Sequence, residues 1–427
     1  MVGLGMIGER RWRSAAAALV VAAAAAAMLP SQSHAATVQG PATNVAASAG
    51  IAQTTQSIGA FVGDINGDGL PDFLLNRAFK ATAREYLNTG GAFVEANAGT
   101  FKRNDKHGCA MDDVNHDSRT DIYCTVGASH GTDVKSNELW MQRADGTFVN
   151  RAVAYAVDDP YGRSRGAVFF DANNDGWDDL FVSNYYPRTD ALPTPNRFFQ
   201  NQAGTSFSSG PAYGLDQTVG GLAQAPGCQD AADYDGDGYT DLLVCGKTSI
   251  HVYHNNGGSS FTDVTASLGP SGVWQDGEWI DFNKDGLLDL AIINHRSLQI
   301  RLQQPDGRFN VVSISRSMTE GRALATGDVN MDGWPDLYAL QGATGPNQVP
   351  NPPDYMYLSG KSGTTLTRVS IPETSAGTGA SVTALDYNGD GTTDFLVTNG
   401  ARSTEGPVQL ISFPPPTTTA ARGAPSR

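Results

Sequence analysis

Short apolar runs alternate with acidic turns along almost the whole chain. One unit begins with "GAFVG" at 59–63, continues through a nine-residue acidic segment at 64–72, and then enters the β-type run "FLLN" at 73–76. After a variable segment come two more apolar runs joined by a glycine turn, as in "REYLNTGGAFVEA" at 84–96. Four short runs separated by turn residues predict a four-stranded antiparallel meander.

The acidic segment recurs seven times, from "DINGDGLPD" near the start to "DYNGDGTTD" near the end. Successive copies lie 47 to 62 residues apart and begin at Asp64, Asp113, Asp171, Asp233, Asp281, Asp328 and Asp386. A period near fifty residues is typical of repeat folds whose units bury their faces against each other. We therefore predict an all-β fold, a seven-bladed β-propeller of four-stranded antiparallel blades.

The two ends of the repeat region predict how the ring closes. The seventh unit has no fourth apolar run, because "VQLISF" at 408–413 is followed by Pro- and Thr-rich sequence. We expect the segment after Thr37 to supply the missing outer strand. The predicted domain is 36–412, and 413–427 is predicted to be a disordered tail.

Residues 1–35 have the organisation of a secretory signal peptide. Arginines at 10, 11 and 13 precede an apolar stretch at 15–29 and small residues at 33–35. Fifteen apolar residues are too few to span a bilayer easily, although a membrane anchor stays open as an alternative. We expect cleavage near Ala35/Ala36, a secreted or periplasmic mature protein with no membrane span, and a monomer.

The charge favours bound cations as partners. The formal charge is −15 at pH 7, and 22 of the 44 acidic residues stand at alternating positions of the seven acidic loops. Such a surface repels phosphates, so we expect no nucleic-acid partner.

Each loop offers oxygen ligands suited to calcium. Side chains at positions 1, 3, 5 and 9 and the carbonyl at position 7 can surround one ion, and glycine at position 6 permits the positive φ of the turn. An EF-hand is excluded because position 12 is apolar, as at Leu75 and Val182. Polar turns without metal are the alternative, but their clustered carboxylates would repel one another.

We expect up to seven structural Ca²⁺ ions. The predicted ligands, blade by blade, are Asp64, Asn66, Asp68, Leu70 and Asp72; Asp113, Asn115, Asp117, Arg119 and Asp121; Asp171, Asn173, Asp175, Trp177 and Asp179; Asp233, Asp235, Asp237, Tyr239 and Asp241; Asp281, Asn283, Asp285, Leu287 and Asp289; Asp328, Asn330, Asp332, Trp334 and Asp336; Asp386, Asn388, Asp390, Thr392 and Asp394.

The second loop departs from the pattern, with Ser118 at position 6. A non-glycine residue at positive φ costs on the order of 1 kcal/mol, so this loop is expected to bind calcium most weakly.

Four cysteines bracket two of the acidic loops. The strands entering and leaving such a loop are antiparallel neighbours, which predicts disulfides Cys109–Cys124 and Cys228–Cys245. Disulfides fit an oxidising compartment outside the cytoplasm.

"GDINGDGLPDFLLN" at 63–76 and "GDVNMDGWPDLYAL" at 327–340 resemble FG-GAP or VCBS repeats, known from the seven-bladed head of integrin α-subunits and from exported bacterial proteins. "DANNDGWDDLFVSN" at 171–184 looks like the bacterial branch related to cartilage acidic protein. The resemblance implies a calcium-stabilised propeller and leaves the activity open, because such families include adhesins, lectin-like binders and propellers attached to lyases or hydrolases.

Ligand-binding candidates lie six residues before each acidic loop, near the expected mouth of the central channel. The basic residues among them, Arg165, Arg322 and His107, could bind an acidic sugar, with Trp274, Tyr185 and Tyr186 elsewhere as stacking platforms. Alternatively, Arg165 and Arg322 pair with carboxylates of neighbouring blades.

Three functions remain open from the sequence. The first is a binding or adhesion module for a glycan or an extracellular protein. The second is a polysaccharide lyase or hydrolase, with His107 or Lys106 removing a proton and Arg165 neutralising a uronate. The third is a purely structural surface protein. Because no nucleophile motif occurs, we expect no catalytic residues.

Overall fold

The computed structural model describes most of the chain between Gly40 and residue 416. The described residues are 40–77, 81–102, 104–127, 135–184, 195–209, 213–215, 228–245, 250–269, 274–315, 318–343, 351–360, 365–371, 374, 376–400 and 404–416.

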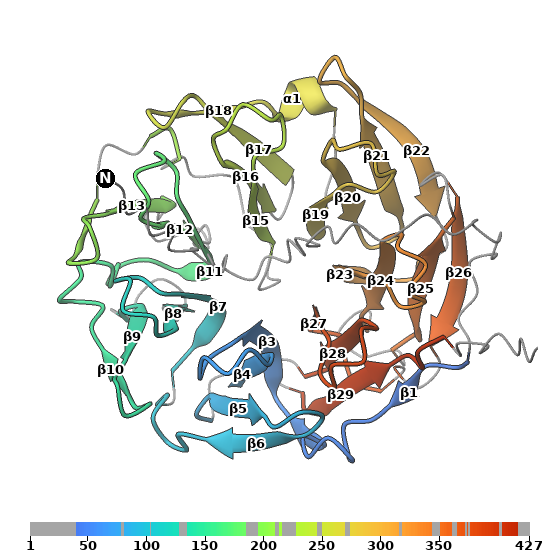
Figure 1. Cartoon of the computed structure of the whole chain (residues 1–427), viewed down its shortest axis with the longest axis horizontal. Helices are drawn as coiled ribbons and strands as arrows, with labels where there is room; N and C mark the ends of the chain where they lie inside the picture. Colours follow the sequence, from blue (N-terminus) through green and yellow to red (C-terminus); the bar gives the residue numbers. More distant parts are fainter. Residues whose placement is uncertain are drawn as a thin grey trace, which may run out of the picture.

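Seven antiparallel sheets stand around a central axis as the blades of a propeller (Figure 1). From the axis outward, blades 1 to 3 contain β3 (Ser57–Gly63), β4 (Asp72–Arg77), β5 (Arg84–Asn88) and β6 (Phe93–Ala96); β7 (Lys106–Asp112), β8 (Asp121–Val126), β9 (Glu138–Gln142) and β10 (Phe148–Asn150); β11 (Ser164–Phe170), β12 (Asp179–Asn184), β13 (Arg197–Asn201) and β14 (Phe207–Ser208). Blades 4 to 6 contain β15 (Gln229–Ala232), β16 (Asp241–Cys245), β17 (Ile250–Asn255) and β18 (Phe261–Asp263); β19 (Asp276–Ile280), β20 (Asp289–Ile293), β21 (Leu298–Gln303) and β22 (Phe309–Ser315); β23 (Gly321–Gly327), β24 (Asp336–Gln341), β25 (Asp354–Ser359) and β26 (Leu366–Ile371). Blade 7 contains β27 (Ser381–Leu385), β28 (Asp394–Thr398) and β29 (Gly406–Ser412), and one short helix, α1 (Thr265–Leu268), follows β18. The predicted all-β, seven-bladed fold is confirmed.

Ring closure comes from the N-terminal segment, as expected. β1 (Thr43–Asn44) and β2 (Gln53–Thr55) both pair antiparallel with β29, so blade 7 combines the two ends of the described chain (Figure 1). The turn between them buries Ala46, Ala49 and Ile51 against blades 7 and 1.

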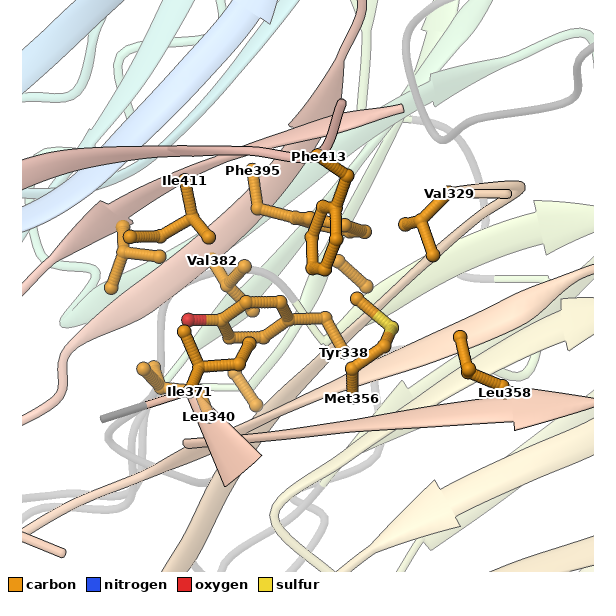
Figure 2. Packing of buried hydrophobic residues seen from close by; sticks show 13 residues of the cluster. Val329, Tyr338, Leu340, Met356, Leu358, Ile371, Val382, Phe395, Ile411 and Phe413 are labelled. Atoms are coloured by element: carbon orange, nitrogen blue, oxygen red, sulfur yellow. The ribbon is translucent and has the colours of Figure 1, made fainter. Parts of the chain in front are cut away.

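The hydrophobic core is divided into seven clusters, one at each interface between neighbouring blades. Figure 2 shows the cluster between blades 6 and 7, where Tyr338 of β24 packs against Phe395 of β28, with 4.8 Å between ring centroids. A single four-stranded sheet cannot cover both of its faces, so each blade depends on its two neighbours for burial.

One predicted boundary is corrected at Phe413. Its side chain is 1% exposed and packs in the cluster between blades 6 and 7 (Figure 2), and its carbonyl accepts a hydrogen bond from Thr392. The packed propeller therefore extends past residue 412, because an aromatic side chain fills space that β29 alone leaves open.

Both predicted disulfides are present. Cys109 and Cys124 are direct partners in the register of β7 and β8. Cys228 and Cys245 face each other where β15 and β16 begin to pair, and no cysteine of the chain is free.

Candidate functional site

The seven acidic loops share one hydrogen-bonded conformation. In every loop the carboxylate at position 1 accepts the backbone N–H of position 6, at 2.7 to 3.0 Å. The carboxylate at position 5 accepts the N–H of position 7 in all seven. Position 6 has positive φ throughout, including Ser118 at 65°. These bonds curl the backbone of all seven loops in the same way.

Position 4 also adopts positive φ in every loop, which the sequence analysis missed. The signal was present, because glycine occupies this position in three copies. The residues and their φ values are Gly67 (79°), His116 (56°), Asn174 (58°), Gly236 (76°), Lys284 (58°), Met331 (53°) and Gly389 (72°).

The aspartate at position 9 is buried in every blade, and in blades 1 to 6 it accepts a backbone N–H of the third strand. Asp72 illustrates the arrangement: one oxygen accepts the N–H of Ile65 in the loop, and the other accepts the N–H of Asn88 in β5. The same bond to the third strand occurs in blades 2 to 6. Burial raises the pKa of these carboxyl groups, to about 6 at Asp72 and about 8 at Asp336.

The donor set of the loops fits a hard divalent cation. In loop 4, carboxylate oxygens of Asp233, Asp235 and Asp237 lie within 4.8 Å of one another. Two ligands on opposite sides of Ca²⁺ are about 4.6–5.2 Å apart, since each bond measures about 2.3–2.6 Å. In loops 2 and 7, one position-9 oxygen (Asp121 Oδ2, Asp394 Oδ1) is buried without a hydrogen bond, as a metal ligand would be.

Loop 2 departs from the others in a second way. The Arg119 guanidinium forms an ion pair with Asp117, the position-5 carboxylate. A cation in this loop would compete with that charge, so the structure gives a further reason for the prediction that loop 2 binds calcium most weakly.

Side-chain amides connect each of four blades to the acidic loop of the preceding blade. The amide belongs to the last residue of the third strand, and its NH₂ donates to the position-2 carbonyl next door. The pairs are Asn88 with Tyr387, Gln142 with Ile65, Asn201 with Val114, and Asn255 with Ala172. In three of the four the residue is an asparagine three positions before a glycine, a pattern visible in the sequence.

Asn201 provides a test of these inter-blade bonds. It is 3% exposed; its N–H bonds to Asp179, its NH₂ to the carbonyls of Val114 and Asp178, and its side-chain oxygen accepts the N–H of Gly204. Asn201→Leu leaves buried carbonyl groups without donors, which costs about 1–3 kcal/mol per group. We expect the free energy of unfolding to fall by about 3 kcal/mol in urea titration.

The matched control for that experiment is Gln202→Ala, at the exposed neighbouring position. If Asn201→Leu lowered the free energy of unfolding no more than Gln202→Ala does, the structural role of Asn201 would be contradicted.

A cavity of about 220 Å³ lies on the propeller axis, lined by the innermost strands of all seven blades. Most of its lining is small or apolar, but blades 4 and 5 contribute Asp230, Asp276 and Glu278. Asp230 accepts the N–H of Trp279 in the next blade, and Asp276 accepts the N–H of Leu324 in the blade after that. The two aspartates thus accept hydrogen bonds from backbone N–H groups of the innermost strands, whose axis-facing edges pair with no further strand.

The pKa values of these three carboxyl groups are raised. Burial is the main cause, and repulsion among the carboxylates adds to it at Asp276 and Glu278. The pKa of Asp276 rises to about 7, and that of Glu278 to about 8. Asp230, Asp276 and Glu278 are the titratable side chains among the described residues that line the cavity.

Glu278 should therefore make stability depend on pH. Its ordinary pKa is 4.5, so between about pH 4.5 and 8 the folded protein holds a proton that the unfolded chain has released. Stability falls as pH rises through that window, because the unfolded state binds fewer protons. We expect wild-type protein in saturating calcium to lose about 4 kcal/mol relative to Glu278→Gln between pH 5 and 9, since about three pH units of that window lie in this range and one pKa unit corresponds to about 1.4 kcal/mol.

Glu405→Gln, at an exposed position, serves as the control for denaturant titrations across this pH range. A constant difference between wild type and Glu278→Gln at all pH values would refute the assignment.

Two of the basic candidates at the channel mouth are buried beside carboxyl groups. Lys106 is 2% exposed with its Nζ 3.0 Å from Glu138, and burial lowers its pKa. His107 is 4% exposed, with Nε2 3.3 Å from Asp105. This corrects the expectation that either side chain is open to the funnel as a proton acceptor: the neighbouring carboxylates hold both inside the blade.

Trp274 is likewise corrected as a stacking platform. It is 3% exposed and packs with the Cys228–Cys245 disulfide in the core between blades 4 and 5. Tyr185 and Tyr186 lie outside the described residues.

The two arginines differ in accessibility. Arg165 is 4% exposed and lies close to His107 over Gly127, where a Cβ would collide with both side chains. Arg322 is partly exposed, and it bonds to Glu320 at 3.3 Å and to the carbonyl of Ala343. Glu320 belongs to the connection just before β23, so this pair does not bridge blades as the alternative expected.

A polar group that the sequence did not reveal surrounds Arg322. Glu320 also contacts Nδ1 of His295 at 2.6 Å, and Nε2 of His295 lies 3.2 Å from the amide of Gln275. Both Gln275 and Arg322 are among the positions six residues before an acidic loop. Because each inner strand runs from this position to its loop, the group lies at the end of the ring opposite the acidic loops.

Among the described residues, no helix is both long and apolar enough to cross a membrane. Fold and loops together define a seven-bladed β-propeller with an acidic, oxygen-rich loop in each blade.

Comparisons with known proteins show which repeat family and which relatives this propeller resembles. The FG-GAP-like repeat model matches residues 113–182, 233–292 and 281–339, and the FG-GAP repeat model matches 378–410. Human cartilage acidic protein 1 is 25% identical over 221 residues, which cover 48% of this chain and 30% of that protein. Integrin alpha-3 of Cricetulus griseus is 28% identical over 137 residues, covering 30% of this chain and 11% of the integrin.

Among solved structures, an Agrocybe aegerita lectin that recognises non-reducing terminal N-acetylglucosamine has the same fold. Its TM-score is 0.50 at 16% sequence identity, covering 81% of this chain and 86% of the lectin. The chain spans less than a third of the length of the curated relatives it matches. It is an FG-GAP repeat protein with an integrin-like seven-bladed propeller.

Proposed function

We propose that this protein is a secreted, calcium-stabilised binding or adhesion module for a glycan or an extracellular protein. The observation that carries the proposal is the identical conformation of all seven acidic loops. A catalytic centre would be expected once in the ring, whereas a structural ion recurs with the repeat. Two disulfides support a location in an oxidising compartment outside the cytoplasm.

In this proposal calcium is held by the side chains at positions 1, 3, 5 and 9 and the carbonyl at position 7 of each loop. The ion supplies positive charge to clustered carboxylates, three or four of which otherwise stand close together in each loop. Because the position-9 aspartate contacts both its own loop and the third strand of the blade, an ion bound to that aspartate holds the two elements together.

The ligand-binding surface is proposed at the end of the ring opposite the acidic loops. The partly exposed group of Arg322, Glu320, His295 and Gln275 offers both charges and an amide, which suits polar ligands such as sugars or peptides. The lectin of the same fold shows that a propeller can recognise a terminal sugar, which supports a sugar ligand here in general terms only. The lyase alternative is disfavoured, because Lys106 and His107 are buried beside Glu138 and Asp105.

A glycan array probed with the labelled full chain tests this function, with and without calcium chelator. We expect binding to particular glycans that disappears on chelation and weakens in Arg322→Ala. Arg308→Ala, an exposed arginine at the tip of the β21–β22 hairpin, is the control. Binding that is insensitive to chelator and to Arg322→Ala would overturn the proposal, and steady release of unsaturated sugars from uronic-acid polymers would replace it with the lyase.

A further inference from the structure

Loop 4 differs chemically from the other six acidic loops. Its position 3 is Asp235, where each other loop has asparagine. It is also faced by His254, near the end of β17. The six residues equivalent to His254, each just before the end of the third strand, carry aliphatic, thioether or amide side chains: Leu87, Met141, Gln200, Leu302, Leu358 and Ile411.

The strand register explains why His254 reaches the loop. Leu242 pairs with Tyr253 in the β16–β17 ladder, so His254 stands across from Asp241, the position-9 aspartate. Its Nδ1 lies 3.2 Å from Oδ2 of Asp235 and 3.3 Å from Oδ1 of Asp241. This nitrogen is buried and makes no hydrogen bond of acceptable geometry, although the imidazole ring as a whole is 26% exposed.

Three ligand atoms at these separations can share one ion. Bonds of about 2.0–2.1 Å to a tetrahedral zinc place neighbouring ligand atoms about 3.3 Å apart. One ligand atom from each of Asp235, Asp241 and His254 lies within 4.8 Å of the others. The exposed part of the ring leaves a side from which water can complete the coordination.

The nitrogen ligand decides which cation is preferred. Calcium and magnesium take oxygen ligands almost exclusively, whereas imidazole nitrogen together with carboxylates suits zinc and neighbouring transition metals. We propose that His254, Asp235 and Asp241 form a binding site for a zinc-class divalent ion, which makes loop 4 selective for a different metal from the other six. This inference goes beyond the proposed function and does not require calcium in the remaining loops.

The site overlaps the calcium position of its own loop. Asp235 belongs both to the group with His254 and to the group with Asp233 and Asp237. Asp241 is likewise the expected position-9 calcium ligand of this loop, so zinc and calcium should compete in loop 4 and nowhere else. The alternative is that the His254 imidazole only contacts the two carboxyl groups and that the three residues bind no metal.

Calorimetric titration with zinc separates these two cases. The full chain, made without a histidine tag, is stripped with chelator and then kept in millimolar calcium. We expect one zinc ion to bind per chain, with imidazole visible in the X-ray absorption spectrum at the zinc edge. His254→Gln should weaken zinc binding by at least about tenfold, as loss of a zinc ligand requires. His251→Gln, on the same strand and paired with Asp263, is the control expected to bind zinc normally.

Asp235→Asn provides a second variant, because it gives loop 4 the asparagine of the other six loops. Asp235→Asn should lose zinc binding and keep calcium binding. If His254→Gln fails to fold, Asp235→Asn alone decides the test. Equal zinc affinity in wild type and either variant, or no zinc binding at all, would overturn the inference. Calcium stoichiometry is measured separately, so failure of the zinc site and failure of the calcium proposal remain distinguishable.

Discussion

Removal of calcium is expected to lower the stability of the propeller by about 10 kcal/mol. An ion that binds only the folded state stabilises it by RT ln(1 + [L]/Kd), or about 1.4 kcal/mol per site at ten times Kd. Seven loops of one conformation would add their contributions. Thermal unfolding in chelator should therefore begin at a much lower temperature than in millimolar calcium.

The dependence of stability on calcium concentration measures how many ions are involved. The slope of the unfolding free energy against the logarithm of free calcium should approach the value for six or seven sites. Magnesium at equal concentration is the control and should stabilise less, because it holds its own waters and demands a stricter geometry. An unfolding curve that does not change between chelator and calcium would remove the basis of the proposed function.

Deletion of the closing strands is the second change with a large expected effect. A chain beginning at Gln56 loses β1, β2 and the buried side chains of Ala46, Ala49 and Ile51. It also leaves β29 as an exposed apolar edge, a known route to aggregation. From the buried apolar area and the lost strand pairing we expect a loss of at least about 5 kcal/mol.

A chain beginning at Gly40 is the matched control, because it keeps both closing strands. The shorter chain should aggregate or unfold at lower denaturant, and a synthetic peptide of residues 40–56 should restore stability by pairing with β29. Equal denaturation midpoints for the two chains would mean that the ring does not depend on this closure.

Local features of the fold were predictable because they depend on neighbours in sequence. The acidic nonapeptide, its flanking apolar runs and the glycine turns each describe one hairpin, and the hairpins repeat. The Cys109–Cys124 and Cys228–Cys245 bridges followed for the same reason, since each joins strands on either side of one turn. Phe413 was misassigned because its burial depends on another blade, whereas its sequence neighbours are prolines.

The candidate ligand surface shows the opposite case. His107, Lys106 and Trp274 stand at equivalent positions or beside them, and periodicity alone placed them at the channel mouth. Their burial is decided by Glu138, Asp105 and the disulfide of blade 4, which occupy the space beside them. The cavity carboxylates escaped prediction because Asp230 and Glu278 come from different blades.

The sequence by itself determined the blade, the number of blades, the acidic loops, the disulfides and the closure of the ring, because each depends on contacts within one hairpin or on the number of repeats. Only the tertiary structure decided which polar side chains are buried, which amides join one blade to the next, and which titratable groups face one another. Those contacts depend on the angle and distance between neighbouring sheets, which the packing of seven interfaces sets together.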